Sequence, residues 1–195
     1  MTLPIRAVIF DMDGTLTRPF LDFRAIRAAI GIGEPLLENM LALPPGPQRD
    51  RAFSILDRFE VEAAEASELN DGALQVLEFL AERRVPSGLV TRNSRRSTDR
   101  VLGKHALSFK VVVTREDAPA KPRPEPLWMI CEKLGVRPAD VLMVGDFKFD
   151  IVAGRNAGTR TALLTNGKTP SYLKEVSPDH VVERLADLLH LFGTK

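Results

Sequence analysis

The sequence is poor in cysteine and carries no excess charge of either sign. Its single cysteine, Cys131, excludes a disulfide framework and a cysteine-based zinc site within one chain. We expect this residue to be a small buried side chain of a helix. The 27 lysines and arginines balance the 26 aspartates and glutamates, which gives a net charge of +1. Such a chain has no general basic field, so we expect no nucleic-acid partner.

Long apolar runs are also absent. No run reaches the roughly 18 residues that a membrane span requires. The run at residues 7–10 is short and is followed at once by Asp11, which is not the pattern of a signal peptide. We therefore expect a cytoplasmic protein with no membrane partner, and the sequence gives no indication of its oligomeric state.

Six short apolar runs are typical of the strands of a buried parallel sheet. Most are rich in β-branched residues and nearly continuous rather than alternating, as strands covered on both faces are. Helical patterns lie between several of them, and this alternation predicts an α/β fold with helices on both faces of a parallel sheet. The runs cover residues 7–10, 88–90, 110–113, 140–144, 161–164 and, more weakly, 180–182, and the helical patterns cover 71–84, 124–134 and 183–192.

One segment after the first strand interrupts the alternation. It contains no convincing strand, and a proline-rich loop separates its helical patterns. Those patterns lie at 22–30, 34–42 and 49–67. We predict an α/β core formed by residues 1–17 and 68–195, with a small helical insertion at 18–67.

Acidic residues follow the first and fourth predicted strands, at the edge where open parallel sheets bind ligands. Asp11 and Asp13 lie two residues apart, so in an extended segment they project toward the same side. Crowded carboxylates repel one another unless a cation lies between them, and Mg²⁺ prefers such oxygen ligands. Asp146 and Asp150 would complete the site, and no histidine or cysteine lies near these motifs to favour zinc.

A hydroxyl and an amine follow the other two strands of this edge. Thr91 ends the second strand and is followed by Arg92 and Asn93, and Lys121 lies in the loop after the third strand. A magnesium site beside a hydroxyl donor and a lysine suits phosphoryl transfer, in which positioning and charge neutralisation dominate.

Together these segments resemble the four motifs of the haloacid dehalogenase superfamily of hydrolases, in the family's order. The resemblance covers residues 5–17 and 71–195 and implies a Rossmann-like core. The insertion is similar in position and helical character to the family's cap, as in phosphoglycolate phosphatase-like members. The motif residues are Asp11-Met12-Asp13-Gly14-Thr15-Leu16, Thr91, Lys121 before Pro122, and Gly145-Asp146 with Asp150, at intervals of 80, 30 and 25 residues from Asp11 to Thr91, Lys121 and Asp146.

The resemblance implies a role for each motif residue. Asp11 is the nucleophile that forms an aspartyl-phosphate. Asp13 protonates the leaving oxygen and then activates water, which requires a raised pKa. Lys121 neutralises the nucleophile and the phosphate. The implied Mg²⁺ ligands are Asp11, the backbone carbonyl of Asp13 and Asp146, with Asp150 as a ligand or behind one, and the phosphoryl oxygens contact Thr91, Lys121 and the backbone N–H groups of Met12, Asp13 and Arg92.

We therefore expect a Mg²⁺-dependent phosphatase whose substrate is a small phosphorylated metabolite, such as phosphoglycolate, a sugar phosphate or pyrophosphate, because a lid limits substrate size. A phosphomutase or a pyrophosphatase on the same scaffold stays open. A dehalogenase has no need of Asp13, and a non-catalytic binding module would be expected to lose Asp11, Asp13 or Lys121. Gly145 is expected to permit a close approach of the backbone to the site.

Overall fold

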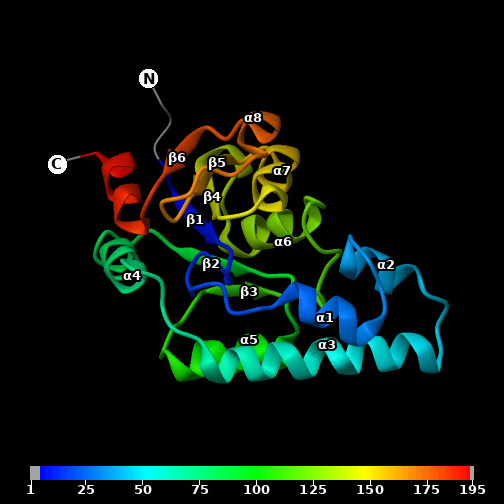
Figure 1. Cartoon of the computed structure of the whole chain (residues 1–195). Coiled ribbons are helices and arrows are strands. Elements are labelled where there is room, and N and C mark those ends of the chain that lie inside the picture. Colours follow the sequence, from blue (N-terminus) through cyan, green and yellow to red (C-terminus); the bar gives the residue numbers. More distant parts are fainter. Residues whose placement is uncertain (1–4, 194–195) are drawn as a thin grey trace.

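The computed structural model describes residues 5–193 and has a six-stranded parallel sheet at its centre (Figure 1). Every neighbouring pair of strands is parallel, so the predicted α/β class and parallel sheet are confirmed. In spatial order the strands are β3 (Val111–Val113), β2 (Ser87–Val90), β1 (Ala7–Phe10), β4 (Val141–Gly145), β5 (Arg160–Leu164) and β6 (His180–Val182).

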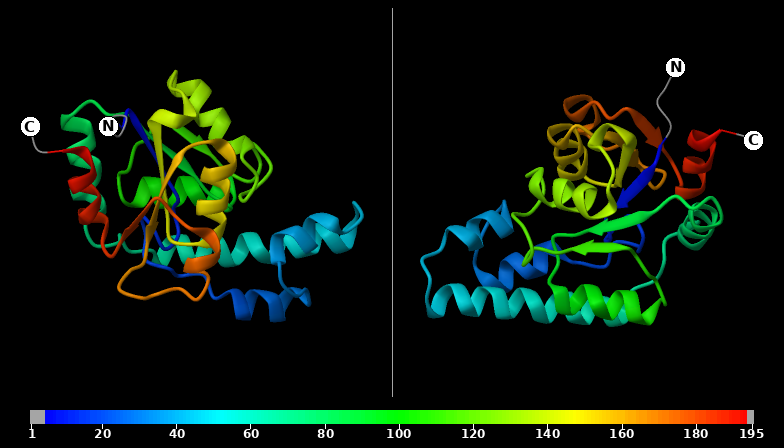
Figure 2. Two further views of the ribbon diagram at one scale, coloured as in Figure 1. Left: turned by 90° about the horizontal axis from the view of Figure 1, so that it is seen from above. Right: turned by 180° about the vertical axis from the view of Figure 1, so that it is seen from behind.

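The strands are apolar throughout because their side chains enter two different cores. In β1, Val8 and Phe10 lie in one core, whereas Ala7 and Ile9 lie in the other. Helices cover both faces, as the two views of Figure 2 show. The first core is closed by α4 (Ala73–Glu82), α5 (Arg95–Lys104) and the 3₁₀ helix η2 (Leu185–Phe192), and the second by α6 (Glu125–Leu134) and α7 (Lys148–Ala157).

Three helices between β1 and α4 form a small cluster of their own. They are α1 (Phe23–Ile30), α2 (Leu36–Ala42) and α3 (Pro47–Ala66). Asp22 caps α1 by accepting a hydrogen bond from the Ala25 N–H at 2.9 Å. The buried residues Ile26, Met40 and Leu56 bring the three helices together.

The long helix α3 is shared between this cluster and the main domain. Its residues Ala52 and Leu56 lie in the small cluster, whereas Ala64 lies in the main core. The second half of α3 runs along α5 (Figure 1). The division at residues 18–67 stays a prediction, and the packing places the change from one core to the other within α3.

The predicted α-helix at residues 183–192 is wrong in type, because residues 185–192 form the 3₁₀ helix η2. Leu185 and Leu188 are both buried, and their spacing of three residues matches the three residues per turn of that helix. The sequence also gave no signal for the short elements η1 (Pro138–Asp140) and α8 (Leu173–Val176).

Cys131 lies buried in α6, as predicted. Burial raises the pKa of its thiol to about 11, so it stays protonated and unreactive near neutral pH. Among residues 5–193, no helix has both the length and the apolar content that crossing a membrane requires.

Candidate active site

The carboxyl ends of β1 and β4 form the switch point of the sheet. The two strands are neighbours, with Phe10 paired to Val144, and the remaining strands extend from them in opposite directions. Loops that leave such neighbouring strands toward opposite faces open a crevice between them. Asp11 follows β1 directly and Asp146 follows β4 directly, so both carboxylates stand at this crevice.

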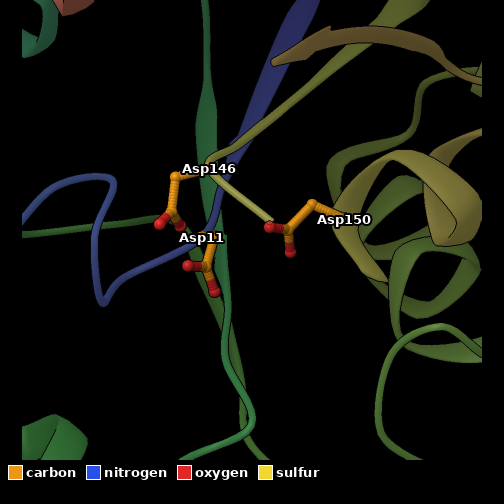
Figure 3. Close-up of side chains that lie close together, drawn as sticks. All are labelled: Asp11, Asp146 and Asp150. Carbon is orange, nitrogen blue, oxygen red and sulfur yellow. The ribbon is translucent and has the colours of Figure 1, made fainter. Parts of the chain in front are cut away.

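Three carboxylates converge at the switch point. Asp11, Asp146 and Asp150 each offer an oxygen, and the three oxygens lie within 4.8 Å of one another (Figure 3). Burial raises the pKa of Asp11 well above its ordinary value, although Lys121 opposes this. Burial and the charge of Asp150 raise the pKa of Asp146 to about 7. An all-oxygen cluster of this kind fits a hard divalent cation, which would relieve the repulsion.

Lys121 is the buried counter-charge of the cluster. Its side chain is 1% exposed, and its Nζ donates to Oδ1 of Asp11 at 2.5 Å and to Oδ1 of Asp150 at 2.6 Å. A third bond runs to the carbonyl of Val90 at 3.2 Å. Burial lowers the pKa of Lys121, but the two carboxylates outweigh it and raise that pKa, so the amine stays a cation.

Two glycines permit this crowding. A Cβ atom at Gly145 would lie 2.2 Å from Cγ of Asp150, and one at Gly14 would lie 2.1 Å from Oδ2 of Asp146. Gly14 also has φ +78°, a conformation that side-chain-bearing residues rarely adopt. The close approach predicted for Gly145 is therefore present.

Asp13 stands apart from the three clustered carboxylates. Its Oδ2 accepts from Nδ2 of Asn93 at 2.6 Å, and its Oδ1 accepts from Oγ1 of Thr17 at 3.4 Å. Burial raises the pKa of Asp13 although both hydrogen bonds oppose it, which agrees with the predicted direction. The metal contact implied for Asp13 uses its backbone carbonyl, so the position of its side chain does not conflict with it.

The residues that end β2 lie at the same edge. Thr91 is buried, and its Oγ1 accepts from the Asn93 N–H at 3.2 Å, which leaves the hydroxyl proton free to donate. Arg92 directs its side chain toward α2, where it forms an ion pair with Glu38. The Met12 side chain is buried in the main core, so only its backbone can face a ligand.

Several side chains that position the loop after β1 were not predicted. Thr15 donates to Oδ1 of Asp146 at 3.2 Å. Asn70 donates to the carbonyl of Thr15 at 3.0 Å, and Asn166 donates to the carbonyl of Gly14 at 2.8 Å. These asparagines lie in loops far from Gly14 in sequence, so motif spacing carries no signal for them.

A second unpredicted group ties α3 to the loop after Thr91. Oε2 of Glu60 accepts from the Ser94 N–H at 3.0 Å, and Oδ1 of Asp57 accepts from Oγ of Ser94 at 2.9 Å. Glu60 is also paired with Arg115, and both side chains are less than 10% exposed. The helix from the insertion therefore holds the loop that carries Thr91 and Asn93.

A cavity of about 850 Å³ lies between α2, α3 and the segment that precedes Lys121. Phe53, Arg49 and Leu37 are among its lining residues, together with Arg115–Ala120. The clustered carboxylates are not part of this lining, so the cavity is distinct from the site at the switch point.

Comparison with known proteins gives the same family as the motifs. Residues 5–158 match the model of the haloacid dehalogenase-like hydrolases. A haloacid dehalogenase-like hydrolase domain-containing protein of Arabidopsis thaliana is 31% identical, over 97% of this chain and 84% of its own length. The pyrophosphatase PpaX of Bacillus cereus is 31% identical over 98% of each chain. A hydrolase from Pseudomonas syringae has the same fold, with a TM-score of 0.80, 22% identity and coverage of 95% of this chain and 97% of its own. The chain therefore belongs to the haloacid dehalogenase-like hydrolases.

Proposed function

We propose that this hydrolase is a Mg²⁺-dependent phosphatase that cleaves a small phosphomonoester through an aspartyl-phosphate on Asp11. The observation that supports it most is the Lys121 amine, which lies between Asp11 and Asp150 at 2.5 and 2.6 Å, beside the third carboxylate of Asp146. A buried cation in contact with the attacking carboxylate suits a reaction in which a carboxylate must approach an anionic phosphate.

The residues at the switch point fit Mg²⁺. Asp11, Asp146 and the backbone carbonyl of Asp13 would hold the ion, and Asp150 would complete the set of carboxylates. Both oxygens of Asp150 already accept hydrogen bonds, from Lys121 at 2.6 Å and from the Phe147 N–H at 3.0 Å, so it also orients the lysine. When bound, the ion supplies positive charge that offsets the negative charge of the phosphate and its acidic surroundings.

In the first half-reaction, Asp11 attacks phosphorus and Asp13 serves the leaving group. One oxygen of Asp11 is held by Lys121, and the other forms the new O–P bond while the bond from phosphorus to the leaving oxygen breaks. The proton of the Asp13 carboxyl passes to that leaving oxygen. The raised pKa of Asp13 supports this role because the group must be protonated at the start.

In the second half-reaction, Asp13 acts as a base. Its carboxylate takes a proton from water, the water oxygen bonds to phosphorus, and the O–P bond to Asp11 breaks with release of phosphate. Both carboxyl groups then return to their starting states. Asn93 and Thr17 support Asp13 in both steps by fixing the direction in which its carboxyl faces.

The phosphoryl oxygens would be held by four kinds of donor. These are the hydroxyl of Thr91, the amine of Lys121, and the backbone N–H groups of Met12 and Asp13 on one loop and of Arg92 on the other. Thr91 supports this role because its oxygen accepts from the Asn93 N–H while its own proton stays available. Such fixed donors stabilise charge that develops on phosphate oxygens.

A phosphate-release screen over a panel of small phosphorylated metabolites tests the proposal. We expect release from at least one compound in the presence of Mg²⁺ and none above background with a chelator. Asp11→Asn should lower the rate at least about 1,000-fold, because the nucleophile is lost. Release that persists in Asp11→Asn, or that does not need a divalent cation, contradicts the proposal.

Pyrophosphate hydrolysis is the second candidate, and the match to PpaX over 98% of both chains favours including it. The same residues would cleave the anhydride, with phosphate as the leaving group. Pyrophosphate in the panel tests this directly, and the ratio of its kcat/KM to that of the best monoester decides between the two activities.

A further inference from the structure

The Arg92 guanidinium lies where the site loops meet the helical insertion. Arg92 follows Thr91, and its Nη1 donates to the backbone carbonyl of Lys121. Its guanidinium also packs on the ring of Phe149, with 4.5 Å from Cζ to the ring centroid. Phe149 immediately precedes Asp150. The guanidinium therefore contacts or adjoins the segments that carry three of the proposed site residues.

A carboxylate from the insertion already fills this guanidinium fork. Nη1 and Nη2 of Arg92 donate to Oε1 and Oε2 of Glu38 on α2, both at 3.0 Å. Burial raises the pKa of Glu38, but the hydrogen bonds from Arg92 outweigh it and lower that pKa, so Glu38 is an anion at neutral pH. This two-point geometry is the one with which arginine binds carboxylate or phosphate groups generally.

The pair is open to solvent and to exchange. The Arg92 side chain is 23% exposed and that of Glu38 is 39% exposed, whereas Lys121 is 1% exposed. A partly exposed ion pair contributes little net free energy. An anion from solution could therefore replace Glu38 at a small cost, which is not true of the carboxylates on Lys121.

A second cation lies against the same aromatic ring. The Nζ of Lys148 is 5.8 Å from the centroid of Phe149 and 5.9 Å from that of Phe147. Lys148 directly precedes Phe149 and is half-buried, and it forms no ion pair with any acidic residue between positions 5 and 193. Two cations thus flank one ring, with Glu38 as the counter-charge of only one of them.

We propose that Arg92 and Lys148 bind a second anionic group of the substrate, which takes the place of Glu38 in the arginine fork. This rests on the proposed phosphatase function and narrows its substrate class. The leaving group carries a carboxylate or a phosphate of its own, and compounds whose leaving group is uncharged, such as simple sugar phosphates, are poor substrates. Glu38 then acts as an internal competitor that an uncharged leaving group fails to displace.

Matched pairs of substrates test the proposal in the full-length protein. 2-Phosphoglycolate and 2-hydroxyethyl phosphate differ only in a carboxylate against a hydroxymethyl group, and pyrophosphate with methyl phosphate forms the phosphate arm. We expect the anionic member of at least one pair to have a kcat/KM about tenfold higher or more, since a charge-assisted bidentate contact contributes that much. The arm with the larger ratio identifies the second group as carboxylate or phosphate.

Three variants separate recognition of an anion from a merely structural ion pair. Arg92→Gln should bring the ratio of anionic to neutral substrate close to one, and Lys148→Gln should lower it in part. Glu38→Gln keeps the shape of the side chain but removes the competitor. It should raise kcat/KM for the anionic substrate several-fold and leave the neutral one within about twofold. A pair that only holds α2 in place would instead change both substrates by the same factor, and that result overturns the proposal.

Binding to Asp11→Asn keeps the test independent of turnover. Calorimetric titration with 2-phosphoglycolate and with 2-hydroxyethyl phosphate should give about a tenfold tighter Kd for the first, and Arg92→Gln in the same background should remove the difference. Equal affinities overturn the second anion site even if the protein is a phosphatase. A clear difference in affinity without turnover of any compound by the wild type contradicts the phosphatase function but leaves the anion site standing.

Discussion

At the scale of single residues, the site depends on two positions that have no side chain. Gly14 and Gly145 carry no chemistry, yet each lets a catalytic-loop carboxylate approach the backbone more closely than a Cβ would allow. The cluster of Asp11, Asp146 and Asp150 exists because this space is free. Its carboxylates are pressed together by burial, and that pressure is what raises the pKa of Asp11 and Asp146.

Gly145→Ala should therefore remove activity with little change in the fold. The new methyl group would lie 2.2 Å from Cγ of Asp150, so that carboxylate and the Lys121 amine bound to it must move. A displacement of about 1 Å at a catalytic group can lower the rate 100-fold, and we expect at least that loss in kcat/KM on the best substrate of the screen.

Gly103→Ala is the matched control for this prediction. Gly103 lies in α5 with open space around its Cβ position, so alanine should leave kcat/KM unchanged and add up to about 1 kcal/mol of helix stability. Equal activity of Gly145→Ala and wild type would show that the tight packing of Asp150 against this strand end is not needed for turnover.

At the scale of elements, α3 joins the insertion to the catalytic loops. Its first half packs with α1 and α2, and its second half packs on α5. Glu60 and Asp57 on this helix bind Ser94, two and three residues after Arg92 and Thr91 respectively. The arrangement of the insertion is thereby tied to the loop proposed to hold phosphate.

Glu60→Gln should destabilise the protein through this connection. Glutamine can still accept from the Ser94 N–H, but Arg115 loses its partner while its side chain is only 9% exposed. Breaking a buried ion pair on one side costs about 3 kcal/mol or more, which for a domain of this size lowers Tm by about 6 °C or more. Thermal unfolding followed by circular dichroism measures the change.

Glu65→Gln on the same helix provides the comparison. Its pair with Arg100 is exposed on both sides, so its loss should change stability by no more than about 0.5 kcal/mol. If the two variants unfold at the same temperature, Glu60 does not anchor α3. A double variant in which both Glu60 and Arg115 are replaced by apolar residues should recover part of the loss, since no charge is then left unpaired.

The sequence predicted these elements where their signal is local. Apolar runs marked the six strands, and the regular spacing of Ile26, Met40 and Leu56 with their neighbours marked the helices of the insertion. Carboxylates and a lysine at strand ends marked the site. The 3₁₀ form of η2 was missed because leucines at 185, 188 and 189 fit either kind of helix. Asn70, Asn166 and Glu60 were missed because their partners are distant in the chain, and one sequence alone contains no sign of such contacts.

At the scale of the whole molecule, the sheet order decides which charges meet. Because β1 and β4 are neighbours, segments more than 130 residues apart bring Asp11 and Asp146 to one crevice, and the loop after β3 adds Lys121. Three clustered carboxylates against one buried amine leave excess negative charge there. The fold therefore keeps a strained electrostatic arrangement that a divalent cation would relieve, which links stability to both pH and Mg²⁺.

The sign of the pH effect follows from Asp146. Its pKa is raised from 3.8 to about 7 in the fold, by burial and by Asp150. The folded protein without metal thus holds this proton more tightly than the unfolded chain does. The stabilising contribution is complete below the unfolded pKa near 4 and is lost as pH rises through about 7. A cation must displace the same proton, so its affinity rises over the same range, by up to tenfold per pH unit below 7.

We accordingly expect Mg²⁺ to raise Tm much more at pH 8 than at pH 6. At 100 times its Kd the ion adds about 2.7 kcal/mol, or about 5–10 °C for a chain of this length, and one pH unit below 7 removes up to about 1.4 kcal/mol of this. Differential scanning fluorimetry with Mg²⁺ and with chelator at both pH values measures it. Asp146→Asn should abolish the shift at either pH, whereas Asp99→Asn, an exposed acid on α5, should retain it. Equal shifts at pH 6 and pH 8 would mean that the ion does not compete with a proton on Asp146 and binds elsewhere.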